Sequence, residues 1–257
     1  MSTGNIYETE QSLAQYLLFH FGGHGEQLPW SFGPVEAIDY AVRTVTGLID
    51  PAKLGPESRA LDLGCAVGRS AFELARYCQE VVGIDYSHHF VAAAETIRRE
   101  GCRAYQYPIE GELMADGLAE LPQGVDPSRL TFQQGDAMNL DPDLGSFDVV
   151  HMANLIDRLT HPMHCLKRLS SLVKPGGQLL LASPFTWLED FTPRKNWLGG
   201  YQDGDTLRRT ATELERLLHP AFRLEYHTDL PFIIREHVRK YQWSAGYAAR
   251  YIRTESA

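Results

Sequence analysis

The residues best suited to chemistry follow a short apolar run and form the pattern Asp62-Leu63-Gly64-Cys65-Ala66-Val67-Gly68. Glycine permits a tight strand-to-helix turn and lets a ligand approach the main chain closely. The Gly-x-Gly-x-x-Gly turn of dinucleotide folds places a pyrophosphate at a helix N-terminus, whereas this spacing is Asp-x-Gly-x-x-x-Gly. An acidic residue here favours a cationic ligand, which Asp62 would hold directly or through water. The alternative is an ordinary turn with a chance aspartate.

Acidic residues also follow two further apolar runs. Val81 to Ile84 leads into Asp85 and Tyr86, and a later run leads into Gln134-Gly135-Asp136-Ala137. A carboxylate at the first position can accept hydrogen bonds from both ribose hydroxyls. Asp136 can accept from the exocyclic amine of adenine, while the backbone N–H of Ala137 donates to the ring. The alternatives are a helix N-cap at Asp85 and a solvated turn at Asp136.

These features fit S-adenosylmethionine, which carries a sulfonium, an ammonium, a carboxylate, a ribose and an adenine but no phosphate. Asn154 follows another apolar run, Phe147 to Met152. Ligands of open α/β sheets bind outside the carboxyl ends of strands, so Asn154 should face both cofactor and substrate. The predicted cofactor-binding residues are Asp62, Gly64, Cys65, Gly68, Asp85, Tyr86, Asp136, Ala137 and Asn154.

Alternating strands and helices must position these residues. Apolar spacing predicts helices over residues 10–21, 34–48, 69–78, 88–100, 161–173 and 206–218. Strands are predicted over residues 60–63, 81–84, 130–133, 147–152, 178–183 and 222–228, with a last one within 239–251. This order indicates an α/β fold with a mainly parallel sheet and helices on both faces, in which the last two strands form an antiparallel edge pair. The long connections 102–128 and 184–205 are predicted lids or binding loops.

The composition excludes several classes of protein. The chain has 257 residues, 44% of them hydrophobic, which suits one large domain or one domain with a small subdomain. It has 24 basic and 33 acidic residues and a net charge of -9, which argues against a nucleic-acid partner. The sequence has no apolar run of about 18 residues and no basic start leading into an apolar stretch, so we expect neither a membrane span nor a secretory signal. The four cysteines lack CxxC spacing and the histidines lack metal-ligand spacing, so we expect no metal and a cytoplasmic location.

The sequence resembles the class I S-adenosylmethionine-dependent methyltransferases. The resemblance rests on the glycine turn, Asp85, Asp136-Ala137, Phe147-Asp148-Val149-Val150 and Lys174-Pro175-Gly176-Gly177, in that order over residues 60–177. It implies a Rossmann-like, seven-stranded, mainly parallel sheet with one antiparallel strand. We expect an N-terminal helical cap or lid over residues 1–50. A methyltransferase domain over residues 51–257 would follow, with insertions at 102–128 and 184–205.

A narrower resemblance, to the 4-mercaptohistidine (5-thiohistidine) N1-methyltransferases of ovothiol biosynthesis, comes from segments outside this core. They are Ile6 to Thr9, Tyr16 to Gly22, Leu28 to Pro34, Phe191 to Gly200, and Ile234 to His237 with the residues that follow it. The resemblance implies methylation of the imidazole Nπ of 5-thiohistidine or its selenium analogue. Many relatives are fused behind an iron-dependent sulfoxide synthase, which suggests docking to a separate synthase here. The alternatives are another small-molecule acceptor or a non-catalytic S-adenosylmethionine-binding protein.

This reaction needs two further kinds of group. Attack by a neutral imidazole requires a hydrogen on the remote ring nitrogen, so an acceptor should lie there, and the catalytic candidates are Asn154, Asp157 and Glu8. The amino-acid carboxylate needs a cation, for which Arg194, Lys195 and Arg235 are candidates. The predicted substrate-binding residues are Tyr7, Tyr16, Arg194, Lys195, Asn196, Trp197, Tyr201 and Arg235. The alternatives are solvated surface charges for the cations and ordinary packing for the aromatic residues.

Overall fold

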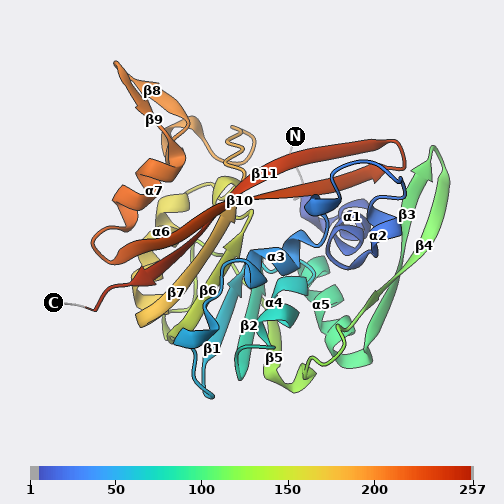
Figure 1. The fold of residues 1–257 in the computed structure, drawn as a ribbon, viewed down its shortest axis with the longest axis horizontal. Helices are drawn as coiled ribbons and strands as arrows, with labels where there is room; N and C mark the ends of the chain where they lie inside the picture. Colours follow the sequence, from blue (N-terminus) through green and yellow to red (C-terminus); the bar gives the residue numbers. More distant parts are fainter. Residues whose placement is uncertain (1–5, 256–257) are drawn as a thin grey trace.

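A seven-stranded sheet forms the centre of the computed structural model, which describes residues 6–255 (Figure 1). The strand order is β10-β11-β7-β6-β1-β2-β5. The bounds are β1 Arg59–Leu63, β2 Glu80–Asp85, β5 Leu130–Gln134, β6 Phe147–Ala153, β7 Val173–Ser183, β10 Phe222–His237 and β11 Lys240–Arg253. β11 pairs antiparallel with both β7 and β10, while the pairs among β7, β6, β1, β2 and β5 are parallel. The predicted mainly parallel sheet with one antiparallel strand is therefore confirmed.

Helices cover both faces of this sheet. Alternate strand residues point to opposite sides, and the residues on both sides are apolar, so each face must be buried. Ala60, Val81 and Val149 belong to one apolar core, together with residues of α1, α3, α4 and α5. Leu61, Val82 and Val150 belong to a second core, with residues of α6 and α7. The helix bounds are α1 Glu10–Phe21, α2 His24–Gln27, α3 Tyr40–Thr46, α4 Arg69–Leu74, α5 His88–Glu100, α6 Pro162–Leu172 and α7 Thr210–Leu218. Two cores hold the strands from both sides and leave their carboxyl ends available for a site.

Three predicted helices are clearly shorter than the sequence indicates. The helix predicted over residues 69–78 is one of them, because α4 ends at Leu74. The helix predicted over residues 34–48 is split, because Asp39 adopts a left-handed φ of 57° between a 3-10 turn, η2 (Val35–Ala37), and α3. The helix predicted over residues 206–218 begins at Thr210. Its first residues instead form β9 (Thr206–Arg208), which pairs with β8 (Tyr201–Asp203) across a turn at Gly204. By contrast, α1 and α5 have the predicted bounds.

The connection predicted as a loop over residues 102–128 is mostly a β-hairpin. β3 (Cys102–Glu110) and β4 (Leu113–Glu120) pair antiparallel, and Tyr105, Tyr107 and Ala119 are buried in the same apolar core as α1. The long strands β10 and β11 run across the region of α1 and α2 towards this hairpin (Figure 1). There the backbone N–H of Val238 donates to the carbonyl oxygen of Ile109 at 3.2 Å. This connection is therefore an ordered part of the N-terminal half and not an open loop.

Short 3-10 turns connect many of these elements. They are η1 Ile6–Glu8, η3 Pro51–Lys53, η4 Pro127–Arg129, η5 Pro142–Leu144, η6 Ile156–Arg158 and η7 Arg194–Asn196. Within residues 6–255, no helix has the length and apolar character needed to cross a membrane.

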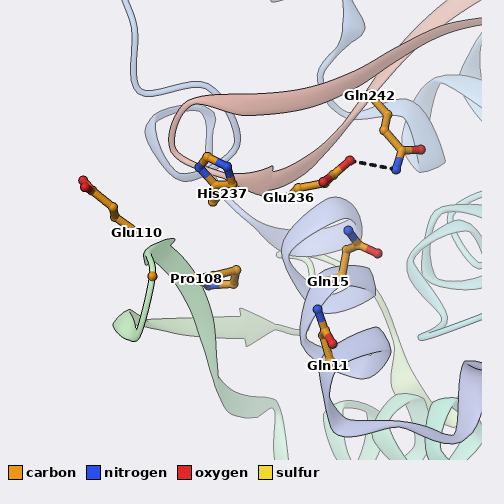
Figure 2. Close-up of a pocket in the computed structure, with 8 residues that line it drawn as sticks. Gln11, Gln15, Pro108, Glu110, Glu236, His237 and Gln242 are labelled. Atoms are coloured by element: carbon orange, nitrogen blue, oxygen red, sulfur yellow. Dashed lines mark hydrogen bonds between the residues drawn. The ribbon is translucent and has the colours of Figure 1, made fainter.

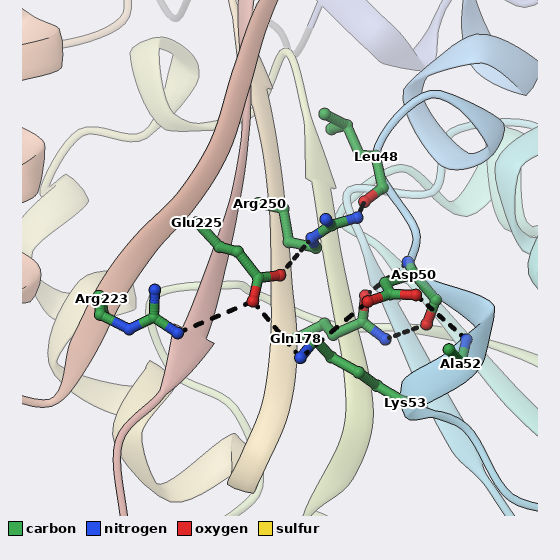
Figure 3. A network of polar contacts seen from close by, with 8 residues as sticks. All are labelled: Leu48, Asp50, Ala52, Lys53, Gln178, Arg223, Glu225 and Arg250. Carbon is green, nitrogen blue, oxygen red and sulfur yellow. Dashed lines mark hydrogen bonds and ion pairs between the residues drawn. The ribbon is translucent and has the colours of Figure 1, made fainter.

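A polar network fixes the segment between α3 and β1 to the part of the sheet formed by β7, β10 and β11 (Figure 3). The Gln178 side chain, fully buried on β7, accepts from the backbone N–H of Asp50 at 2.8 Å and donates to the carbonyl oxygen of Asp50 at 3.0 Å. Glu225 accepts from Arg250 at 2.8 Å and pairs with Lys53 at 3.4 Å. The chain entering β1 is thereby held against β7, β10 and β11.

We predict that Gln178→Ala destabilises the protein, because the backbone N–H and the carbonyl oxygen of Asp50 both lose the buried side chain that they bond. The expected loss in the free energy of unfolding is about 2 kcal/mol, within the range for unsatisfied buried polar groups. Urea denaturation followed by circular dichroism measures this loss. Gln202→Ala, on the exposed β8–β9 hairpin, is the matched control and should change stability by less than about 0.5 kcal/mol. Equal stability of the two variants would contradict the role assigned to Gln178.

Candidate active site

A cavity of about 970 Å³ lies at the carboxyl ends of the central strands. Gly64 follows β1, Asp85 ends β2, Asp136 lies just beyond β5 and Asn154 follows β6, and all four line this cavity. The place agrees with the general position of ligand sites in open α/β sheets.

A second cavity of about 480 Å³ lies elsewhere, between α1, β3 and the turn that joins β10 to β11 (Figure 2). Its wall includes Gln11, Gln15 and Glu236, and Glu236 already accepts from Gln242 at 3.1 Å and pairs with Lys240 at 2.6 Å. Because it is remote from the strand ends, we take the larger cavity as the candidate active site.

The glycine turn forms one wall of the active-site cavity. The backbone N–H of Gly64 donates to the carbonyl oxygen of Ile84 at 2.8 Å, and Gly64 has a left-handed φ of 77°. A Cβ atom there would lie 3.1 Å from Leu155. The Asp85 carboxylate accepts from the next turn of chain, at the backbone N–H of Ala66, at 2.8 Å. Glycine at position 64 is thus required by backbone conformation and by close packing beside the cavity.

Asp85 lies in the cavity wall between the turn and α5. Its second oxygen accepts from the backbone N–H of Ser87 at 2.9 Å, while Ser87 itself caps α5 by accepting from Phe90 at 3.2 Å. The N-cap alternative therefore belongs to Ser87 and not to Asp85. Burial raises the pKa of Asp85 to about 6, although hydrogen bonds from the backbone N–H groups of Ser87, Ala66 and Tyr86 act in the opposite direction. Hydroxyl donors from a ligand would stabilise its ionised form. Tyr86, next in the chain, lines the cavity with an exposed side chain.

Asp136 and Ala137 form the wall beside the end of β5. Asp136 accepts from the backbone N–H of Met138 at 2.8 Å, and Ala137 is buried in the second core. The Met138 sulfur in turn lies 3.3 Å from the Thr160 hydroxyl. This tetrapeptide is therefore a packed wall of the cavity and not a freely solvated turn.

Asp62 differs from its expected position. It is 1% exposed, and its oxygens accept from the Ser70 hydroxyl at 2.6 Å and bond His151 Nδ1 at 2.7 Å. The other nitrogen of His151 lies 3.0 Å from the Thr44 hydroxyl. Ser70 and Thr44 line the cavity, whereas Asp62 lies behind them. Asp62 therefore does not line the cavity as expected. It contacts the Ser70 hydroxyl directly and the Thr44 hydroxyl through His151, and these two hydroxyls lie in the wall.

Cys65 and Gly68, also predicted to bind the cofactor, lie outside the cavity wall. Cys65 is fully buried, and this burial raises the pKa of its thiol well above the usual range. A Cβ atom at Gly68 would lie 2.9 Å from the Phe132 ring. Packing against the sheet therefore explains these two residues better than ligand approach.

The N-terminal segment supplies the opposite wall of the cavity. Tyr7, Tyr16, Phe19, His20 and Tyr40 line it, as Tyr7 and Tyr16 were expected to do. The Tyr16 ring lies 4.7 Å from that of Phe90, between centroids. Burial lowers the pKa of His20 to about 4, so its imidazole is neutral at physiological pH. The sequence signal for Phe19 and His20 was their place on the same helix face as Tyr16, at spacings of three and four residues.

Asn154 connects the two walls. Its φ is 52°, uncommon for a residue other than glycine, and its side-chain carbonyl accepts from the Tyr40 hydroxyl at 3.0 Å. Tyr40 was not identified from the sequence, because it lies within the segment predicted as a continuous helix. Asn154 is the one proposed catalytic residue of the three that lines the described cavity.

Glu8 and Asp157 have structural partners elsewhere. Glu8 accepts from the backbone N–H of His88 at 2.8 Å, which places it at the N-terminus of α5, where a carboxylate is stabilising. Asp157 is fully buried and accepts from the backbone N–H of Thr186 at 2.8 Å. Burial raises the pKa of Asp157, and the neighbouring Arg158 opposes this shift. Neither residue lines the cavity, so the expected acceptor role is not supported by their positions.

The predicted cations also lie outside the cavity wall. Arg194 is placed over the rings of Trp197 and Tyr201, 4.7 and 4.6 Å from their centroids. Arg235 is 6% exposed, donates to the carbonyl oxygen of Glu26 and lies 5.2 Å from the Tyr107 ring. Only types and spacing were visible in the sequence, and these side chains pack on neighbouring rings instead.

The remaining residues expected around Arg194 are similarly placed. Lys195 is exposed, the Asn196 amide donates to the carbonyl oxygen of Thr160 at 2.7 Å, and the Trp197 indole donates to that of Thr192 at 2.7 Å. From this connection, Asp190 and Phe191 are the residues that reach the cavity. No group of three His, Cys, Asp or Glu side chains able to hold a metal occurs within residues 6–255.

We predict that the affinity for S-adenosylhomocysteine, the demethylated cofactor, decreases when the pH is lowered below about 6. Asp85 takes up a proton as the pH falls through its pKa of about 6, and a protonated carboxyl is a poorer acceptor for ribose hydroxyls. Because binding favours the ionised form, the dissociation constant should rise about tenfold between pH 7 and pH 5. Isothermal titration calorimetry measures this profile. Asp85→Asn should bind weakly at every pH, whereas the exposed Asp205→Asn should retain the wild-type profile. A wild-type affinity independent of pH would contradict the ribose contact.

Comparison with known proteins agrees with this geometry. A family model described as "Methyltransferase domain" matches residues 61–181. The ubiquinone biosynthesis O-methyltransferase of Xanthomonas campestris is 27% identical over 128 residues, which are 50% of this chain and 44% of that protein. The matched part thus spans less than half the length of that curated relative.

Two solved structures share the fold over almost the whole chain. The [4+2]-cyclase SpnF has a TM-score of 0.57 at 16% identity, covering 98% of this chain and 95% of that one. The magnesium protoporphyrin IX methyltransferase of Synechocystis PCC 6803, solved with bound S-adenosylmethionine, has a TM-score of 0.51 at 16% identity, covering 97% and 100%. At such identities a structural match shows the fold alone. Taken together, these findings show a methyltransferase domain over residues 61–181 on a Rossmann-like methyltransferase fold, and they support S-adenosylmethionine as the cofactor.

Proposed function

We propose that this protein methylates the imidazole Nπ of 5-thiohistidine, or of its selenium analogue, as the last step of an ovothiol-type biosynthesis. The observation that carries the proposal is a single cavity with two different walls. The strand ends supply polar groups suited to the cofactor, and the N-terminal segment supplies aromatic rings suited to an imidazole and a sulfonium. A volume of about 970 Å³ suits a cofactor with a small acceptor rather than a macromolecule.

In this proposal the cofactor extends along the carboxyl edge of the sheet. Asp85 accepts from the ribose hydroxyls, Asp136 and Ala137 bind the adenine, and the main chain at Gly64 approaches the methionine end. The cofactor supplies an electrophilic methyl group on a sulfonium. Residues 1–50 act as a cap over the site, and residues 1–5 of that cap lie outside the described part of the chain.

The protein's own contribution to such a reaction is position. The attacking nitrogen carries a lone pair, so it needs alignment with the methyl carbon and sulfur more than it needs a base. Asn154 can fix the tautomer, because its carbonyl oxygen has two lone pairs and the Tyr40 hydroxyl uses one of them. The other can accept from the N–H of the remote ring nitrogen and hold the reactive nitrogen towards the cofactor. The remote proton is lost to solvent after the N–C bond forms and the C–S bond breaks.

The resemblance to ovothiol methyltransferases extends the proposal to a partner protein and to a cellular location. It suggests docking to a separate sulfoxide synthase that supplies thiohistidine, in the cytoplasm. A second candidate acceptor is an oxygen nucleophile such as a phenol, because the Xanthomonas relative is named an O-methyltransferase.

Methyl-labelled S-adenosylmethionine tests the acceptor directly. We expect label on Nπ of 5-thiohistidine, detected by mass spectrometry and located by NMR, and much slower transfer to histidine and to a catechol. Preferred transfer to the catechol would favour the second candidate. Binding of S-adenosylhomocysteine without transfer to any acceptor would indicate a non-catalytic cofactor-binding protein.

Asn154→Gly tests the proposed tautomer control while keeping a residue that tolerates positive φ. Loss of one hydrogen bond to the reacting ring should lower kcat about tenfold and leave affinity for the cofactor within about twofold. Asn154→Asp, which keeps an acceptor oxygen, should retain most of the activity. If both variants lose activity equally, or if neither does, Asn154 does not set the tautomer.

A further inference from the structure

One cationic side chain reaches the active-site cavity from an unexpected place. Arg158 lies in η6, the short turn after β6, and it is the one lysine or arginine within residues 6–255 that lines this cavity. The sequence drew no attention to it, because the turn has neither helical nor strand periodicity. An amino-acid acceptor brings a carboxylate into this space, so the only cation in the described wall has a clear chemical counterpart.

The guanidinium of Arg158 is held firmly from one side. Its Nη1 donates to the carbonyl oxygen of Asp157 at 3.0 Å, to the Asp157 carboxylate at 3.1 Å and to the carbonyl oxygen of Thr186 at 3.0 Å. Its plane is supported by the Phe191 ring, with 4.7 Å between the guanidinium carbon and the ring centroid. Because one nitrogen of the guanidinium is already fixed, the side chain loses little conformational entropy when the other edge of the guanidinium binds a carboxylate.

The surroundings of Arg158 offer the complementary groups for an amino acid. Burial raises the pKa of Tyr7, whose side chain also lines the cavity, and the neighbouring Arg158 opposes this rise. Asp190, the neighbour of the supporting Phe191, lines the same cavity and can bind an ammonium. The three alternative cations, Arg194, Lys195 and Arg235, do not reach this cavity.

We propose that Arg158 binds the α-carboxylate of the methyl acceptor and that Asp190 receives its α-ammonium, so the acceptor is a free α-amino acid. This inference rests on the proposed function and deepens it by naming the residues that bind the amino-acid end of the acceptor, because a phenol or a decarboxylated amine brings no carboxylate to Arg158. The cofactor also carries an α-amino-acid end, whose expected place is beside Gly64 at the end of β1, and the affinity for S-adenosylhomocysteine distinguishes that carboxylate from the carboxylate of the acceptor. Charge-assisted bidentate bonds of this kind distinguish carboxylates from neutral groups strongly.

The test compares 5-thio-L-histidine with its decarboxylated counterpart, 5-thiohistamine. For Arg158→Gln, kcat/KM with thiohistidine should fall about 100-fold, and with thiohistamine by less than about threefold. Arg158→Lys should fall between, because an ammonium keeps the charge but not the fork. Arg194→Gln, whose side chain packs on aromatic rings outside the cavity, is the matched control and should keep the wild-type preference. Asp190→Asn should weaken both amines but not a deaminated analogue.

Three outcomes overturn the inference. An equal loss for both acceptors in Arg158→Gln would mean a structural role. A matching rise in the dissociation constant of S-adenosylhomocysteine would assign Arg158 to the cofactor. A wild-type enzyme without preference for the carboxylate would remove the premise.

Failure of the proposed function remains distinguishable from failure of this inference. If the wild-type protein does not methylate thiohistidine, binding of L-histidine and histamine to the protein loaded with S-adenosylhomocysteine still measures carboxylate recognition. A preference for L-histidine that disappears in Arg158→Gln would support the inference. Equal binding of both probes would overturn it.

Discussion

The structure of the site depends on one partly buried carboxylate at the end of β2. Asp85 holds the glycine turn through Ala66 and the start of α5 through Ser87, at 2.8 and 2.9 Å. Register makes this possible, because the parallel pairing that sets Leu63 opposite Ile84 brings the ends of β1 and β2 to the same level. The same carboxylate faces the cavity, and burial makes its ionised form costly. Hydroxyl donors on a ligand, such as those of a ribose, are therefore the kind of partner that this position favours.

A second layer behind the cavity wall connects α3 to the sheet. Asp62 on β1 and His151 on β6 are each 1% exposed, and between them they reach Ser70 on α4 and Thr44 on α3. Buried networks in which each polar group has a partner fix a single arrangement. The hydroxyls in the wall are thus positioned by groups that never touch a ligand, and α3 is tied to the strands that carry the site.

Local patterns predicted the parts of this molecule that local physics determines. The apolar runs and the polar residues at their ends located β1, β2, β5 and β6 and the cavity positions of Asp85, Asp136 and Asn154. The β3–β4 hairpin was missed, because Tyr105 and Tyr107 are buried by contact with the distant α1 rather than by any local rule. The sequence also could not predict the direction in which a side chain points. The spacing around Arg194 indicated a cation among aromatic rings, but not that these rings hold it away from the cavity.

Tyr7, which the sequence predicts as a substrate-binding residue, lines the cavity and links two parts of its wall. Its carbonyl oxygen accepts from the Ser87 hydroxyl at 3.0 Å, beside Asp85, and its own hydroxyl contacts Arg158. η1 therefore contacts both Ser87, beside Asp85, and Arg158. Under the proposed function these contacts lie next to the cofactor and next to the acceptor, so a substitution that shifts η1 should change the affinity for both ligands. By linkage, any effect of one ligand on the affinity of the other through this shared element must be equal in both directions.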